Sequence, residues 1–478
     1  MRKLFCAIAL AACLGSANLS AQAYRVGVDP RIELMSILFR LAGSEEYTQC
    51  RVPSYLDAVE RHFGPYRNHE AVQLARRLRE TDGVSYDAVM SMAVYLTDAT
   101  TLAERVPFDR PDLKLDQRWH GVKAGRFLEA ARRFVADAHF AEFLKSQQPL
   151  YDTTNERLRA FVEAKGDLPW FTKFFGAKSA ARFIIVPGLV NGPSSYGASI
   201  IAEDGTEELY AIPGVFETDV DGLPKFRGNW LETMVHEFVH SYSNPLIDEF
   251  SGSLEQAGMR LNEPLEAEMR SQGYGPWKTL LYESMVRAVA VRYAFDHDGP
   301  KAAERAVLHE QLRAFICTDE LADLLGEYEK NRQTYPTLES FMPQVVKYFE
   351  GAAARVGVLI KRVDDLRPKI AKLSIENGSR DIDPRLTAIV VRFDRPMDTS
   401  AWAVAQRNPT QFPRVGRVSF DKTGMVFTIP VTLEADRDYE MALNWPGGGS
   451  FASEDGVPLK YVLLHFHTRP ARPTVSKR

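Results

Sequence analysis

Cysteine is scarce in this sequence, with four among 478 residues. Long apolar runs are absent beyond the N-terminus, because no later segment reaches the roughly 18 apolar residues that a membrane-spanning helix needs. Neither sign of charge dominates, since the formal net charge is −4 at pH 7. These absences argue against a membrane span and against nucleic acid or an anionic membrane surface as partner.

The N-terminus has the pattern of a targeting segment. Met1–Lys3 is basic, Leu4–Ala12 is apolar but too short to span a bilayer, and Ala21–Ala23 is a small-x-small cleavage site. A signal peptide over 1–23 is therefore predicted, with export to the periplasm or secretion. The alternative is a lipoprotein, because Leu10–Cys13 is similar to a lipobox that would carry lipid on Cys13.

Two cysteines would remain after cleavage behind Ala23, namely Cys50 and Cys317. In an oxidising compartment they could form a disulfide. The alternative is two separate buried thiols, and the sequence does not choose between them, because separation along the chain says nothing about distance in space.

The most informative stretch is Asn229–Pro245, which contains His-Glu-x-x-His. Its apolar side chains recur at a helical spacing. Asn229 is a suitable N-cap, with Glu232 three residues later as in a capping box, and Asn244–Pro245 is a suitable end. The motif is therefore predicted to lie within a helix.

On that helix His236 and His240 share one face, one turn apart, where two imidazoles can bind one zinc ion. Glu237 lies beside them, where it can take a proton from a zinc-bound water whose pKa falls to about 7. The alternative is a pair of solvated histidines, and the apolar flanks of the motif argue against it. The motif predicts zinc, with His236 and His240 as ligands and Glu237 as general base.

A catalytic zinc site needs a third protein ligand and one open position. Trp277–Tyr293 predicts a second, largely apolar helix that carries Glu283 and Arg287. Because a buried carboxylate needs a cation, Glu283 is the predicted third ligand and Arg287 the residue that steadies it. The alternative is a surface Glu–Arg pair. Competing ligands in a more polar stretch are Glu263, Glu266 and Glu268.

The length of the chain allows two or three domains. Helices are predicted at Ile32–Leu41, Ala71–Leu78, Tyr86–Tyr95 and Phe127–Leu144, and again over 300–365. Short strands are predicted at 182–188, Ala198–Ala202 and Glu208–Ile212. Tyr196–Ile200 is a candidate edge strand that lines the cleft and pairs with an extended substrate, although an ordinary edge strand is the simpler reading. Asn262–Gly275 is expected to be a loop.

Beyond Arg367–Pro368 the pattern is all β. Strands are predicted at Ile370–Ile375, Ala388–Phe393, Arg417–Phe420, Met425–Ile429, Tyr439–Leu443 and Tyr461–His467. Many short strands separated by turn residues favour a β-sandwich. His465 and His467 alternate along one predicted strand and are expected to face solvent.

Residues 24–365 resemble the bacterial DUF4932 family of exported, predicted zinc peptidases. The matching residues are Ile32–Leu38, His236–Ser241 with Asn244–Pro245, and Glu283 with Arg287–Ala288. A motif followed by a distant glutamate is also similar to gluzincin peptidases. The resemblance implies an α+β fold: a mainly helical, zincin-like metallopeptidase domain with a small sheet, in which His236, His240 and Glu283 bind zinc and Glu237 is the base.

Residues 368–470 resemble a bacterial Ig-like domain of the surface-layer type. The resemblance rests on Val391–Asp398 and Leu433–Tyr439. Such modules act as spacers or adhesive appendages, which implies an association with the cell surface.

The expected function is that of an exported zinc-dependent metallopeptidase, acting on a peptide or protein substrate. One alternative is an exported binding or scaffold protein that keeps the zincin fold without turnover. Another is a zinc hydrolase that acts on a different amide, such as a cell-wall peptide. An oxyanion-stabilising donor is also expected, and three tyrosines remain open for it: Tyr196, Tyr242 and Tyr274.

Overall fold

The computed structural model describes residues 24–108, 110, 115–119, 122–176, 181–445 and 450–470. The predicted signal peptide and Cys13 lie outside the described residues. By its internal contacts the chain divides into two compact units. Unit 1 is Met1–Leu254, Leu281–His297 and Ala322–Lys347, and unit 2 is Glu255–Leu280, Asp298–Leu321 and Tyr348–Arg478.

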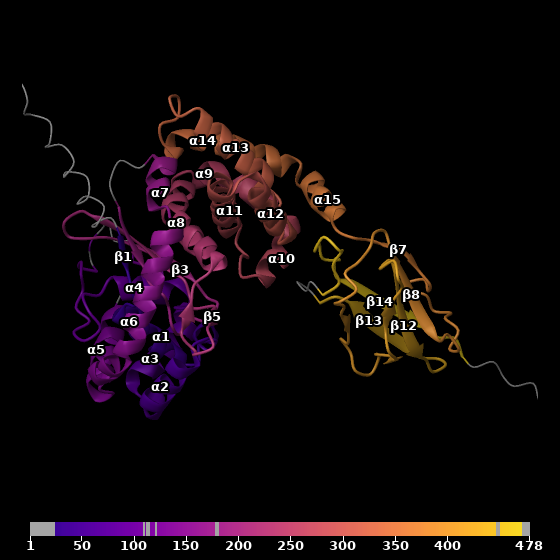
Figure 1. The fold of residues 1–478 in the computed structure, drawn as a ribbon, viewed down its shortest axis with the longest axis horizontal. Helices are drawn as coiled ribbons and strands as arrows, with labels where there is room; N and C mark the ends of the chain where they lie inside the picture. The colour runs from indigo at the N-terminus through magenta and orange to yellow at the C-terminus, as the bar shows by residue number, and fades with distance from the viewer. Residues whose placement is uncertain are drawn as a thin grey trace, which may run out of the picture. The chain divides into compact units, whose positions relative to one another are not determined.

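Helices dominate the described chain up to residue 366 (Figure 1). The helices are α1 Pro30–Leu41, η1 Glu45–Tyr47, α2 Pro53–Phe63, η2 Gly64–Tyr66, α3 Glu70–Asp82, α4 Asp87–Val94, η3 Gln117–Trp119, α5 Val122–Asp137, α6 Phe140–Lys165, α7 Leu168–Phe175, α8 Gly228–Glu249, α9 Ser251–Asn262, η4 Glu263–Leu265, α10 Glu266–Ser271, α11 Trp277–Asp298, α12 Pro300–Leu312, α13 Thr318–Lys330, α14 Leu338–Ala354 and α15 Val356–Leu366. No helix among the described residues combines the length and apolar character needed to cross a membrane.

Strands form a four-stranded sheet and a two-stranded sheet in unit 1, and two further sheets in unit 2. In unit 1 the strands are β1 Tyr24–Val26, β2 Arg182–Ile185, β3 Tyr196–Ile201, β4 Glu207–Ile212, β5 Glu217–Thr218 and β6 Pro224–Lys225. In unit 2 they are β7 Ile370–Leu373, β8 Ala388–Phe393, β9 Val404–Ala405, β10 Arg414–Val415, β11 Ser419–Phe420, β12 Val426–Thr432, β13 Asp438–Leu443 and β14 Val462–His467. The chain is therefore α+β, as predicted.

α1 packs against α3, α4 and η1. Asp29 caps α1 by accepting a hydrogen bond from the Arg31 N–H, and Pro30 supplies a pre-set φ at the first helical position. Nearly every side chain of α1 is buried, so this helix runs through the apolar core. The predicted helix over Ile32–Leu41 is thus confirmed. The predicted helix over Phe127–Leu144 is wrong as one piece, because His139 adopts a φ of 49° and separates α5 from α6.

A buried carboxyl on α1 makes the stability of unit 1 dependent on pH. Glu33 is fully buried, and its Oε1 accepts a hydrogen bond from the Leu189 N–H at 3.0 Å. Burial raises the pKa of Glu33 to about 7, although hydrogen bonds from Tyr55 and Leu189 oppose the rise. The neutral, buried carboxyl of Glu33 contributes to the free energy of unfolding. This contribution is fully present below the pKa that Glu33 has in the unfolded chain, and it is lost as the pH rises through about 7.

Glu33→Gln is therefore expected to flatten the pH dependence of unfolding. Between about pH 5 and about pH 8 the wild-type chain should lose roughly 2 kcal/mol more unfolding free energy than the variant. Denaturant titrations at the two pH values measure this difference, with the exposed Glu45→Gln as control. Equal pH slopes for wild type and Glu33→Gln would show that Glu33 is ionised at no cost in the folded chain.

The larger sheet of unit 1 has the order β1-β2-β4-β3, and β5 pairs with β6 in a separate sheet. β1, β2 and β4 run parallel, and β3 is an antiparallel strand at the edge. α8 packs against β4 and β3, which places the motif helix on this sheet. The strand predicted at Ala198–Ala202 begins two residues earlier, at Tyr196. β1 is not among the predicted strands, because its three residues are too few to show a period of two.

The motif helix α8 is longer than predicted at both ends. It begins at Gly228, with Arg227 rather than Asn229 at the N-cap, and it continues through Pro245 to Glu249. Proline leaves the carbonyl four residues earlier, that of Ser241, without a helical donor. Pro245 is exposed and Ser241 is partly exposed, so water can reach this turn and the helix tolerates the loss.

Asn262–Gly275, predicted as a loop, is largely helical, because α9 ends at Asn262 and η4 and α10 follow. The pair Glu263-Pro264 suggested a break, but proline is accepted in the first turn of a helix. Glu266 and Arg270 form an i, i+4 ion pair that supports α10. Met269 is the one buried residue of α10, so this short helix shows little apolar periodicity.

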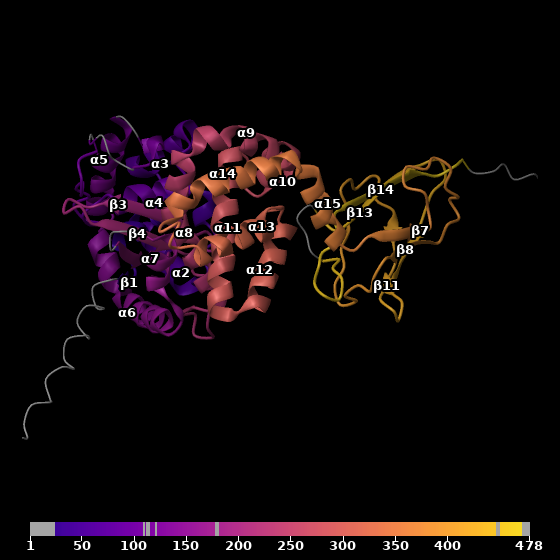
Figure 2. The same ribbon diagram turned by 90° about the horizontal axis from the view of Figure 1, so that it is seen from above.

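Unit 2 ends in two sheets (Figure 2). Buried side chains from both sheets form one apolar core. One sheet has the order β10-β12-β8-β7, with β11 also paired to β12, and the other has the order β14-β13-β9. The core is built only from residues between 370 and 466. The prediction of β structure beyond Pro368 is confirmed, and β8 has the predicted bounds.

Cys50 and Cys317 are both free thiols. Cys317 is buried and Cys50 is partly buried. The structure therefore agrees with two separate thiols.

Candidate metal centre

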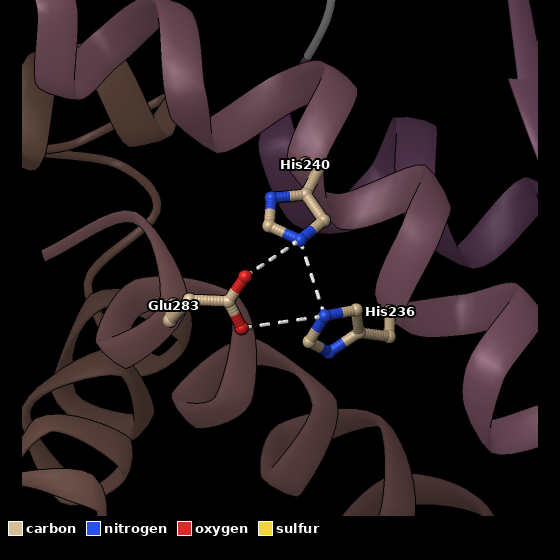
Figure 3. Close-up of side chains that lie close together, drawn as sticks. All are labelled: His236, His240 and Glu283. Atoms are coloured by element: carbon tan, nitrogen blue, oxygen red, sulfur yellow. Dashed lines mark hydrogen bonds and ion pairs between the residues drawn. The ribbon is translucent and has the colours of Figure 1, made fainter. Parts of the chain in front are cut away.

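Two long helices bring the three predicted ligands of unit 1 together. α8 carries His236 and His240, and α11 carries Glu283. The ligand atoms of the three side chains all lie within 4.8 Å of one another, and Figure 3 shows them converging on one point. Among the described residues, no other set of three His, Cys, Asp or Glu side chains is placed to share an ion. This group can hold a metal ion.

The distances within the group fit a divalent cation. Glu283 Oε1 lies 3.4 Å from His240 Nε2, and Glu283 Oε2 lies 3.5 Å from His236 Nε2. The two Nε2 atoms are 3.1 Å apart. Lone pairs aimed at one point repel unless a proton or a cation lies between them. Two imidazole nitrogens and one carboxylate are also the donor set that zinc takes in many hydrolases.

The carboxylate of Glu283 is buried against a cation. Glu283 is 7% exposed and Arg287 is 5% exposed, and Arg287 Nη2 donates to Glu283 Oε2 at 2.8 Å. Burial alone would raise the pKa of Glu283, but His240, His236 and Arg287 hold it well below its usual range. Glu283 is therefore ionised at neutral pH, which is the form that binds a metal. The structure places Arg287 where the sequence predicted it.

His240 is held from both sides of its ring. Burial alone would lower the pKa of His240, but the hydrogen bond and charge of Glu283 raise it to about 9. On the other side of the ring, His240 Nδ1 lies 3.2 Å from Asn244 Oδ1. A metal ion at this position would displace the proton that Glu283 stabilises on Nε2. Sequence reasoning missed the contact of Asn244, because it ended the helix there.

Glu237 lies on α8 between the two histidines and is 7% exposed. Burial raises the pKa of Glu237 to about 7, an effect that the charge of His240 partly offsets. A carboxylate with a pKa near neutral pH is well matched to accept and return a proton.

Gly197 on β3 lies against the turn of α8 that carries Glu237. A Cβ atom at position 197 would be 2.9 Å from the Glu237 backbone oxygen and 3.5 Å from Glu237 Oε2. Only glycine allows the strand and the helix to approach this closely. Sequence reasoning did not single out Gly197, because no local pattern signals an approach between distant segments.

The outer edge of β3 leaves its backbone groups unpaired. The Ala202 N–H donates to the Thr206 carbonyl at 2.9 Å, which extends the ladder between β3 and β4. Bonded and non-bonded pairs alternate along an antiparallel ladder, so every second residue of β3 points its backbone N–H and C=O outward. These groups make no hydrogen bond within the described part of the chain. The outward-pointing, partly exposed residues are Gly197, Ser199 and Ile201.

The three tyrosines considered for oxyanion stabilisation each have aromatic neighbours of their own. Tyr196 neighbours Gly197 on β3 and so points to the opposite face of the sheet, where its ring lies 6.2 Å from that of Tyr47. Tyr242 stacks on Phe175 with ring centroids 4.4 Å apart. Tyr274 belongs to unit 2 and packs on a phenylalanine of that unit.

The alternative ligands for the metal lie outside the group. Glu263 belongs to η4, and Glu266 and Glu268 belong to α10, all within unit 2. Glu266 pairs with Arg270 on its own helix. None of these carboxylates belongs to the group of described residues that could share an ion.

One family model matches the chain. It is described as "Domain of unknown function (DUF4932)" and covers residues 24–348. Among curated proteins, none matches this chain.

Similar solved structures include three of a bacterial surface-layer protein, SbsC. "Crystal structure of the S-layer protein rSbsC(31-844)" is 16% identical with a TM-score of 0.18, and covers 50% of this chain and 34% of that chain. "Structure of surface layer protein SbsC, domains 1-6" is 13% identical with the same coverage and TM-score. The chain thus spans about a third of the length of these two structures.

Proposed function

Because the chain belongs to the DUF4932 family, whose function is unknown, we propose from its own residues that it is an exported zinc-dependent metallopeptidase. The single observation that carries this proposal is the convergence of His236, His240 and Glu283 beside the buried Glu237. Three protein ligands leave a fourth position of a tetrahedral zinc site open, as catalysis requires.

A zinc ion bound to these side chains would polarise the scissile carbonyl and lower the pKa of the attacking water to about 7. Glu237 accepts the proton that this water gives up as its oxygen bonds to the carbonyl carbon. Glu237 then passes the proton to the amine nitrogen as the carbon–nitrogen bond breaks. Arg287 keeps Glu283 ionised and oriented throughout, because it stays bonded to one carboxylate oxygen.

The edge of β3 favours an extended peptide as substrate. Its unpaired N–H and C=O groups at Gly197 and Ser199 can form a further antiparallel or parallel ladder with a substrate backbone. Gly197 lies against Glu237, so a peptide paired there would run past the catalytic base. Backbone pairing fixes the scissile carbonyl without requiring a particular side chain.

Gly197→Ala is expected to lower kcat/KM about 100-fold while zinc remains bound. The added methyl group would collide with the Glu237 carbonyl oxygen and push the base away from its position, and a shift near 1 Å can cost about this factor. Peptide cleavage and zinc content measure the two effects. Gly125→Ala on α5, where a methyl group meets open space, is the matched control. Unchanged cleavage by Gly197→Ala would contradict the tight approach of β3 to the base.

We also propose that residues 368–470 form an Ig-like sandwich of the surface-layer type that acts as a spacer at the cell surface. Support comes from the two sheets around one core and from the residues that resemble such modules. Within this region, His467 Nδ1 lies 2.7 Å from Asp438 Oδ1. This exposed pair is not part of the group of described residues that could share an ion.

The proposal is tested by incubating the zinc-loaded full-length chain with a mixed peptide library and reading cleavage by mass spectrometry. A parallel sample treated with a chelator is the control. Cleavage that stops with the chelator and returns with zinc is the expected result. Zinc binding without cleavage of the library or of cell-wall peptides would instead support a binding or scaffold protein. Cleavage of cell-wall peptides alone would narrow the substrate to that class of amide.

A further inference from the structure

Asn244 lies one helical turn after His240 on α8, with its Oδ1 3.2 Å from His240 Nδ1. We infer that Asn244 is a positioning residue, which fixes the tautomer and the ring orientation of His240 and thereby sets the metal affinity of the group. The inference rests on the metal-binding part of the proposed function and not on peptide cleavage.

The amide oxygen of Asn244 determines where the proton of His240 lies. A carbonyl oxygen only accepts, so His240 Nδ1 must carry the hydrogen that is shared with it. In the neutral ring Nε2 then holds a lone pair, and this atom is the one that faces Glu283 and His236. The opposite amide orientation would place a donor at Nδ1 and force the proton onto Nε2, where a metal ion could not bind.

The backbone at Asn244 maintains this contact against local preference. A residue before proline is disfavoured in the helical conformation, and asparagine is a weak helix former. Nevertheless α8 continues through Asn244 and Pro245 to Glu249. Had the helix ended at Asn244, the i, i+4 geometry that aligns its side chain with His240 would be lost.

A neutral amide at this position also limits the negative charge near the metal. Glu283 and Glu237 are already buried beside the histidines. A carboxylate at position 244 would make His240 a more basic ligand and add a third negative charge. Asparagine therefore orients the ring with less electron donation than aspartate would supply.

The test is the zinc dissociation constant of the full-length chain, measured by competition with a chelator in the absence of substrate. Asn244→Ala is expected to weaken zinc binding about 10- to 100-fold, the usual effect of removing such a partner. Asn244→Asp, which keeps an acceptor for Nδ1, is expected to bind zinc at least as tightly as wild type. Asn229→Ala, the same change at the start of the same helix, should leave the affinity unchanged.

The outcomes separate this inference from the proposed function. A wild-type chain that binds zinc, with equal affinity in Asn244→Ala, overturns the inference alone. The inference is also overturned if Asn244→Asp binds zinc as weakly as Asn244→Ala does. This outcome counts even if Asn244→Ala proves poorly folded. A wild-type chain that binds no zinc overturns both. Zinc binding without peptide cleavage contradicts only the peptidase, because the affinities still report on Asn244.

Discussion

Glu237→Gln is expected to abolish peptide hydrolysis while the zinc ion remains bound. Glutamine has the shape of glutamate but cannot accept the proton of the attacking water at neutral pH. General-base catalysis contributes about 10²- to 10⁴-fold, so kcat should fall by at least this range while KM changes little. Because Glu237 is buried and neutral glutamine avoids burying a charge, the variant should fold at least as stably as wild type.

Steady-state cleavage of a peptide found in the library screen, together with zinc content, measures this prediction. Glu249→Gln is the matched control, because it makes the same change at the exposed end of the same helix. Cleavage by Glu237→Gln at the wild-type rate would show that another group takes the proton. Loss of zinc from the variant would show instead that Glu237 contributes to the metal site.

Glu283→Gln is expected to weaken zinc binding by several orders of magnitude. The change removes the anionic member of the group and leaves two neutral imidazoles. It also removes the buried carboxylate that accepts the hydrogen bond of Arg287 Nη2, which lowers folding stability. The melting temperature of the variant should therefore fall even in the absence of metal.

Chelator competition gives the affinity, and thermal unfolding of the metal-free chains gives the stability. Glu266→Gln is the informative control, because Glu266 was an alternative ligand and lies on α10 in unit 2. Wild-type affinity in Glu283→Gln with a loss in Glu266→Gln would move the third ligand to α10. A loss of affinity in Glu283→Gln alone supports the group on α8 and α11.

The sequence predicted the two helices that carry the candidate site because each of them has a strong local signal. His236, Glu237 and His240 form a short motif, and their apolar flanks repeat at the helical period. Glu283 was found because it is a carboxylate within a largely apolar helix, where a charge needs a partner. Both signals depend on neighbours along the chain, so they can be recognised without a structure.

Some features could not be predicted from the sequence. They depend on contacts between segments that are distant along the chain, or on small energy differences between continuing and ending a helix. Gly197 is required because β3 lies close to α8. Gly197 and its neighbour Glu237 are 40 positions apart along the chain. The extent of α8 depends on whether water can reach the turn before Pro245, and the residue pair Asn244-Pro245 alone suggests an end. β1 becomes a strand only because β2 supplies its hydrogen bonds.

The central claim is that His236, His240 and Glu283 bind one zinc ion with a position left open for catalysis. An X-ray absorption spectrum at the zinc edge of the wild-type chain tests this claim most directly. It should show about four nitrogen and oxygen neighbours at roughly 2.0–2.1 Å, including the outer-shell features of two imidazoles. A sulfur neighbour near about 2.3 Å, or no zinc retained after gel filtration, would contradict the claim.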